Sequence, residues 1–115
     1  MLGNLIGMSA FDPESGIFIP LMPELFNRIR VAVAPDRVTI GDHADDRLRE
    51  RRIPVWQVLA GLDEGKLLRE RPNAKPNPAI EVEQVLADGA SIKVMWSWLG
   101  YNQTAKLVTV HFFDR

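Results

Sequence analysis

The chain contains no cysteine in its 115 residues. Disulfide bonds, thiolate metal sites and cysteine nucleophiles are therefore excluded, and so is an extracellular scaffold held together by disulfides. The sequence also has no apolar run near the roughly 20 residues that a membrane-spanning helix requires, so we expect no membrane partner. Residues 1–10 lack the basic start of a secretory signal, and Asp12 and Pro13 interrupt the apolar stretch too early. We therefore expect a cytoplasmic protein, unless the chain is a piece of an exported one.

An excess of charge of one sign is absent as well, since the net charge is −1 and the pI is about 6.1. This balance argues against a protein whose whole surface binds nucleic acid, although it is compatible with a local basic patch. The rest of the composition, with 46% hydrophobic and 25% charged residues, is typical of a soluble globular protein. A chain of this length forms one domain around a single core.

Residues 1–22 are interpreted as an N-terminal extension, and residues 23–115 as a single domain. The extension is apolar and contains several glycines, and Ile17–Ile19 is predicted to be a short strand. Because an apolar tail is costly to solvate, we expect it to pack on its own domain or against a second copy. Its glycines would equally suit a linker. A homodimer formed through this segment is therefore one of the expected assemblies.

Three helices are predicted, over about residues 24–34, 43–52 and 54–64. Apolar residues recur at helical spacing in each of these segments. Pro23 suits the first position of the first helix, and Asp42 is the expected N-cap of the second.

After the helices the apolar residues alternate with polar ones, as in half-buried strands. Four strands are predicted there, over about residues 66–71, 79–87, 91–99 and 105–113. Val38–Ile40 forms either a fifth short strand or an extended entry into the second helix. The expected fold class is α+β, with two to three helices packed on one face of a three- to five-stranded antiparallel sheet.

Asp88-Gly89 is a hairpin signal between two of these strands. A three-residue loop over Asp88–Ala90 would pair Leu86 with Ile92 and keep the apolar side chains on one face. A register one residue away would mix the two faces, so the three-residue loop is predicted. Gln84 then lies on the apolar face, which is unusual for an amide side chain.

The stretch 40–53 carries a histidine-alanine pair at His43, then Arg47, then a glutamate-arginine pair ending at Arg51. It resembles a small bacterial domain family of unassigned function, whose members carry His-Ala…Arg…Glu-Arg-Gly-Ile ahead of a three- or four-stranded antiparallel sheet. That family resembles, more distantly, the ribonuclease toxins of the barnase–EndoU–colicin–RelE group, including the BrnT type. Arg52 stands where the family has glycine. If that backbone position is left-handed, Arg52 costs about 1 kcal/mol relative to glycine.

The resemblance implies a metal-independent ribonuclease site at His43, Arg47 and Arg51. Such an enzyme needs proton transfer at the reacting oxygens and cations for the developing phosphate charge. Histidine suits the proton transfer, and arginines one and two helical turns further along suit the phosphate. The alternative is that the arginines pair with carboxylates such as Asp46 or Glu50, and that His43 only begins the helix.

His111 in the last predicted strand is a second catalytic candidate. It would form an acid–base pair with His43 if the helix packs over the face that carries it; otherwise a backbone partner satisfies it. No cofactor and no metal are expected, because His43 and Asp46 supply only two ligands on one helical face. Trp96 and Trp98 could stack bases, but their alternation in an apolar strand is more typical of a core.

The leading functional hypothesis is a toxin-like ribonuclease domain that cleaves RNA by acid/base catalysis without a metal. Its expected partners are RNA and a cognate antitoxin or immunity protein. The alternative is a non-catalytic protein-interaction module, either dimeric or itself antitoxin- or immunity-like. The acidic pI suits that alternative better, because ribonuclease toxins of this group are usually basic.

Overall fold

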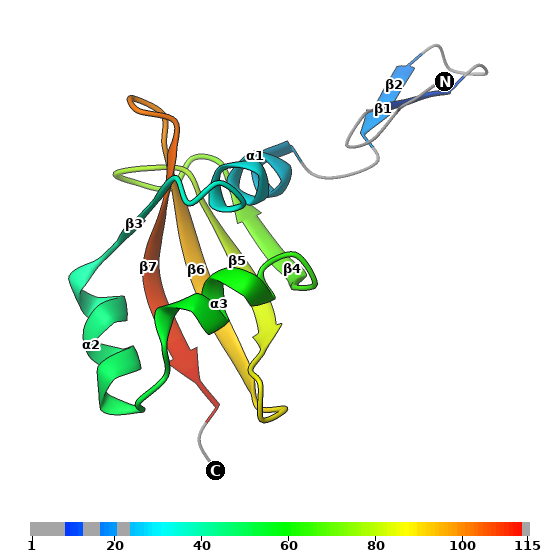
Figure 1. Ribbon diagram of the computed structural model, residues 1–115. Helices are drawn as coiled ribbons and strands as arrows, with labels where there is room; N and C mark the ends of the chain where they lie inside the picture. Colours follow the sequence, from blue (N-terminus) through cyan, green and yellow to red (C-terminus); the bar gives the residue numbers. More distant parts are fainter. Residues whose placement is uncertain (1–8, 13–16, 21–23, 114–115) are drawn as a thin grey trace.

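The computed structural model describes residues 9–12, 17–20 and 24–113. Residues 1–8, 13–16, 21–23 and 114–115 lie outside this part, and so does the expectation for Pro23 at the first position of the first helix. The described part contains three helices and two separate sheets (Figure 1). None of its helices is long and apolar enough to cross a lipid bilayer.

The helices are α1 (Glu24–Val33), α2 (Asp42–Glu50) and α3 (Val55–Gly61). The strands of the main sheet are β3 (Val38–Ile40), β4 (Lys66–Arg71), β5 (Ala79–Val85), β6 (Ser91–Leu99) and β7 (Thr104–Phe112). They lie in the order β3-β7-β6-β5-β4, and the helices lie on one side of them (Figure 1). The predicted α+β class is confirmed, and the ends of the predicted helices and strands differ from the observed ones by at most three residues.

The sheet is mixed, whereas a wholly antiparallel sheet was predicted, because β3 runs parallel to β7. Helix α1 packs across β4, β5, β6 and β7 before the chain enters β3 at the far edge of the sheet. There the backbone oxygen of Arg37 accepts the N–H of Ala105 at 3.0 Å. Alternation of apolar residues carries no information on strand direction, so this parallel pairing was not visible in the sequence.

Two further strands, β1 (Ser9–Asp12) and β2 (Ile17–Pro20), pair antiparallel in a sheet of their own. The short strand predicted at Ile17–Ile19 is thereby confirmed. The division of the chain into an extension and one domain stays a prediction.

The core lies between the helices and the inner face of the main sheet. Each helix contributes a fully buried side chain, namely Ile29 of α1, Leu48 of α2 and Val58 of α3. Trp96 and Trp98 are also buried there, as their alternation predicts.

The β5–β6 hairpin has the predicted loop length but a register shifted by two residues. Leu86 pairs with Ala90, since its N–H donates to the Ala90 oxygen at 2.8 Å, and the loop is therefore 87–89. Gly89 has φ 89°, and a three-residue hairpin loop needs a left-handed residue at its last position. The glycine thus fixes where the loop lies. An even shift keeps every side chain on its predicted face, so Gln84 still points inward, opposite Ile92.

Gln84 is 1% exposed and joins α3 to the sheet through two hydrogen bonds. Its Nε2 donates to the Val58 oxygen at 2.8 Å, and its Oε1 accepts the Trp96 Nε1–H at 3.1 Å. Buried polar groups are stable when paired in this way, and the pairing explains an amide on the apolar face. Gln84 therefore fixes the position of α3 over β5 and β6.

Helix α2 begins one residue earlier than predicted, with Gly41 as N-cap and no side-chain capping bond from Asp42. The Gly41 N–H donates to the Leu107 oxygen at 2.8 Å. A Cβ at Gly41 would lie only 3.0 Å from that oxygen. Close approach of the backbone to β7 therefore determines this boundary, in place of a capping side chain.

Helices α1 and α2 end in the same backbone arrangement. Arg52 has φ 56° after α2, and the N–H of Ile53 donates back to the Leu48 oxygen at 2.9 Å. Asp36 has φ 63° after α1, with the equivalent backbone bonds. Both ends are Schellman motifs whose left-handed position usually holds glycine. The left-handed backbone considered for Arg52 is confirmed.

Candidate functional site

The predicted arginine row runs along α2 and ends at Arg51, the C-cap residue of this helix, which packs on β7 through Ala44 and Leu48. Arg47 and Arg51 are one turn apart and converge on the same aromatic ring, that of Phe112 at the end of β7. Their guanidinium carbons lie 5.5 Å and 4.4 Å from the ring centroid. The two predicted phosphate ligands are thus brought together on Phe112.

Phe112 is 7% exposed, so its ring is a buried support beneath the two cations. A cation over an aromatic face is attracted by the ring quadrupole, by about 0.5–2 kcal/mol depending on desolvation. The Nε of Arg47 is buried and has no hydrogen-bond partner among the described residues. A buried donor of this kind is costly unless a partner satisfies it. An anion that approached Arg47 and Arg51 would meet positive charge that the ring holds in place.

A hollow of about 360 Å³ opens next to this pair, between the α2–α3 turn and the β5–β6 hairpin. We call it the arginine hollow, and its lining residues are Arg51, Arg52, Ile53, Gln57, Leu86, Ala87, Asp88, Ala90 and Phe112. Two of its polar side chains already bond backbone groups. The Gln57 Oε1 accepts the N–H of Ala87 at 3.1 Å, and the Asp88 Oδ1 accepts that of Ala90 at 2.9 Å.

His43 is exposed in the first turn of α2 and does not line the arginine hollow. It lies about 12 Å along the helix axis from Arg51, because eight residues rise at 1.5 Å each. No hydrogen bond or ion pair to its ring occurs within the described part of the chain. His43 is therefore accessible on the same row as the arginines but two turns away from the hollow.

His111 points to the opposite face of the sheet from Phe112, since successive side chains of a strand alternate. It lies opposite Lys93 on β6, and its ring meets that of Phe113 edge to face at 5.5 Å. Helix α2 packs on the face that carries Phe112. The pairing of His43 with His111 depended on α2 covering the His111 face, and that condition is not met.

The ion pairs considered for Arg47 are not among those that the described residues of α2 form. Arg49 bonds Asp45 at 2.9 Å, whereas no pair between Arg47 and either Asp46 or Glu50 occurs within residues 24–113. Arg47 is held by Phe112 instead. That ring was not singled out in the sequence, because an apolar residue near the end of a strand does not differ in pattern from any other core residue.

No group of three or more histidine, aspartate or glutamate side chains that could hold a metal ion occurs among the described residues. The charged side chains that line the arginine hollow are one carboxylate, Asp88, and two arginines, Arg51 and Arg52. Its chemistry suits an anion.

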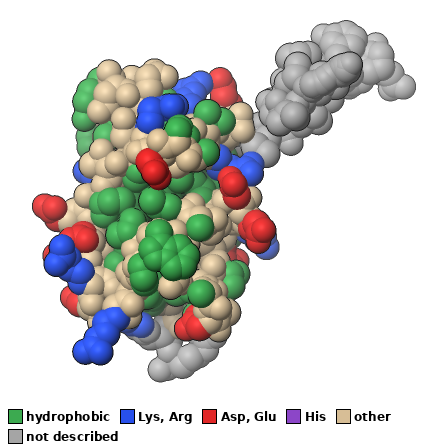
Figure 2. All heavy atoms as spheres, in the orientation of Figure 1, with side chains coloured by type: hydrophobic (Ala, Val, Ile, Leu, Met, Phe, Trp, Pro, Cys, Tyr) green, Lys and Arg blue, Asp and Glu red, His purple; other side chains and the backbone are tan. Residues whose placement is uncertain are grey.

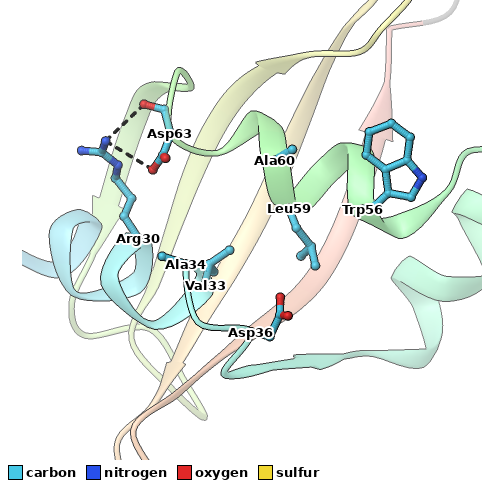
Figure 3. A pocket seen from close by; sticks show the side chains of 8 residues that line it. All are labelled: Arg30, Val33, Ala34, Asp36, Trp56, Leu59, Ala60 and Asp63. Carbon is cyan, nitrogen blue, oxygen red and sulfur yellow. Dashed lines mark hydrogen bonds and ion pairs between the residues drawn. The ribbon is translucent and has the colours of Figure 1, made fainter.

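A second depression, of about 410 Å³, lies between α1 and α3 (Figure 3). We call it the α1–α3 groove, and its lining residues are Arg30, Val33, Ala34, Asp36, Trp56, Leu59, Ala60 and Asp63. Arg30 and Asp63 lie at one end, joined at 3.4 Å, and Trp56 lies at the other. The apolar side chains of α3 lie between them.

Fold and site together define an α+β domain with an arginine pair anchored on an aromatic ring at one end of its sheet. The family model described as "Domain of unknown function (DUF4258)" matches residues 40–111, more than half of the chain. The chain therefore belongs to this family, and the match runs from the end of β3 through α2 almost to the end of β7. Comparisons with curated proteins and with solved structures give no match. The more distant likeness to ribonuclease toxins stays a prediction.

Proposed function

We propose that this domain is a toxin-like, metal-independent ribonuclease that binds the RNA backbone on the α2 arginine row. The observation that carries the proposal is the convergence of Arg47 and Arg51 on Phe112 beside an open hollow. A guanidinium offers planar, paired donors that match phosphate oxygens. Arg52, at the rim of the same hollow, adds a third cation.

In this proposal Arg47, one helical turn from His43, stabilises the charge that develops on the reacting phosphate, and Arg51, two turns from His43, holds a neighbouring phosphate of the same RNA chain. His43 transfers the proton, because it is the histidine on the helix that carries them and its ring is exposed. RNA would have to extend along α2 to reach both groups. The proposal assigns no role to His111, because its side chain lies on the opposite face of the sheet from Phe112.

The test is expression of the wild-type chain beside His43→Ala and Arg47→Ala, with growth, RNA cleavage and RNA binding measured for each. We expect the wild type to arrest growth and to cleave RNA. His43→Ala should abolish cleavage but retain binding. Arg47→Ala should weaken binding about tenfold and reduce its salt dependence by about one phosphate contact.

Arg69→Ala is the matched control, because Arg69 is exposed on β4 and pairs in register with Glu81 on the outer face. It removes the same charge from a surface remote from Phe112. Absence of cleavage by the wild type would refute the catalytic part of the proposal. Equal RNA binding by Arg47→Ala and Arg69→Ala would refute the site.

The cytoplasmic location and the cognate antitoxin or immunity protein expected from the sequence belong to this proposal. The second candidate function is the protein-interaction module. It is favoured by the α1–α3 groove, where a tryptophan is exposed beside apolar side chains.

A further inference from the structure

Trp56 is the exposed tryptophan of this fold, at 64%, whereas Trp96 and Trp98 are buried. It stands between two depressions, the α1–α3 groove and a smaller one of about 210 Å³ that reaches Val85 and Ala87. Figure 2 shows hydrophobic side chains gathered into a patch on the face where α3 lies. An exposed apolar patch with a central aromatic side chain is typical of a protein-binding surface.

The polar groups around the groove are mainly acidic. Asp36 and Asp63 line it, and Glu64 is exposed next to Asp63. Arg30 and Asp63 form an ion pair at 3.4 Å and offset each other, which leaves Asp36, together with Glu64 beside the groove, as the negative charge of the rim. Arg37, although it follows Asp36, lines a different depression and donates to the Gln103 oxygen at 3.3 Å. The groove therefore combines an apolar floor with a negative rim.

From this combination we infer that the α1–α3 groove binds an amphipathic helix with a basic polar face, supplied by a partner protein. Apolar side chains one turn apart on such a helix would pack around Trp56 and onto Leu59 and Ala60. Lysine or arginine side chains flanking that apolar stripe would reach Asp36 and Asp63. Complementary charge at the rim speeds association and excludes acidic partners.

The charge of the groove also argues against the two occupants that the chain itself could supply. A second copy placed face to face would bring a second acidic rim toward the first. The N-terminal extension, residues 1–22, carries Asp12 and Glu14 and contains no lysine or arginine. Neither occupant offers the positive charge that the rim requires.

The experiment uses the full chain and two synthetic helical peptides with the same leucine positions, one with lysines and one with glutamates on the polar face. Binding is measured by titration calorimetry and by the tryptophan emission of the protein. We expect the lysine peptide to bind at least tenfold more tightly and to shift the emission to shorter wavelength. A lysine peptide with its leucines scrambled serves as the control for charge alone and should not shift the emission.

Three variants locate the contact. Trp56→Ala should abolish calorimetric binding, and Asp36→Asn combined with Asp63→Asn should weaken it about tenfold. Tyr101→Ala, at a residue that is 83% exposed in the β6–β7 loop, should leave binding unchanged. All four substituted positions are at the surface, and matching unfolding midpoints would establish that the three variants fold.

Equal affinity for the two amphipathic peptides, or binding that survives Trp56→Ala, would overturn the inference. So would a dimer whose dissociation on dilution shifts the tryptophan emission to longer wavelength, because a second copy would then occupy the groove. If deletion of residues 1–22 shifted the tryptophan emission to longer wavelength, the extension would be the segment that occupies the groove. None of these results depends on whether the arginine row binds RNA.

Discussion

The arginine hollow and the α1–α3 groove differ in charge although both are built on α3. Gln57 lines the first, and its neighbour Trp56 lines the second. The hollow is lined by two arginines and one aspartate, whereas the groove is lined by two aspartates and one arginine, which pairs with one of those aspartates. One short helix thus separates a surface suited to phosphate from a surface suited to a basic helix.

This contrast depends on where α3 lies, and Gln84 determines that position from within the core. The chemistry of each surface depends on the residues that other elements bring to it. α2 and β7 supply the cations and their ring, and α1 supplies an acidic turn. The two surfaces can therefore be perturbed together through the core or separately at the surface.

The largest effect is expected from Gln84→Met, which removes the bond to α3 and leaves Val58 O and Trp96 Nε1–H buried without partners. Each such group costs about 1–3 kcal/mol, so the free energy of unfolding should fall by about 3 kcal/mol. Urea denaturation measures it. Gln57→Met is the matched control, since that amide is only partly buried and should cost about 1 kcal/mol. Similar losses for the two variants would mean that the buried bridge does not hold α3.

Phe112→Leu should impair the arginine hollow and leave the α1–α3 groove unchanged. Loss of the ring beneath Arg47 and Arg51 should weaken RNA binding about tenfold, because roughly 1.4 kcal/mol of cation–π attraction disappears. Fluorescence anisotropy with a labelled single-stranded RNA at fixed salt measures this. Phe113→Leu makes the same type of substitution on the opposite face of the sheet, beside His111, and should have little effect on RNA binding. Unchanged RNA affinity in Phe112→Leu would show that the ring does not organise the arginines.

Replacing the left-handed residues by glycine should stabilise both helix ends. Arg52→Gly should raise the free energy of unfolding by about 1 kcal/mol, since glycine adopts positive φ without strain. Asp36→Gly should gain less, because aspartate tolerates this conformation better than arginine. Thermal and urea unfolding measure both variants. A loss of stability in Arg52→Gly would mean that contacts of the arginine side chain outweigh its backbone strain.

The smallest effect is expected for Asp63→Asn, which breaks the ion pair with Arg30. An exposed pair contributes at most about 0.5 kcal/mol, so stability should change little and salt should reduce the difference further. Differential scanning calorimetry at low and high salt measures this. A decrease in the free energy of unfolding well above 1 kcal/mol would mean that the Arg30–Asp63 pair holds the fold of the groove together and does not only charge its surface.

The elements of the main sheet and the helices were predictable because each carries its own period of apolar residues. The position of Gly89 could have set the hairpin register as well, had the left-handed requirement of the third loop residue been applied. The left-handed position at Arg52 was considered only through the family resemblance. A short strand at Val38–Ile40 was one of the two predicted alternatives, but its parallel direction had no local signal, since that direction follows from the path of α1 across the sheet.

Of the candidate site, the sequence by itself determined that His43, Arg47 and Arg51 lie on one row of one helix, because helical spacing is a local property. Only the tertiary structure decided which of them converge. Packing of α2 on β7 brings Arg47 and Arg51 onto Phe112, a residue more than 60 positions away in the chain, and leaves His43 exposed. The alternation of β7 turns His111 to the other face. Local spacing fixes neighbours along an element, whereas burial of apolar surface between elements selects which distant side chains meet.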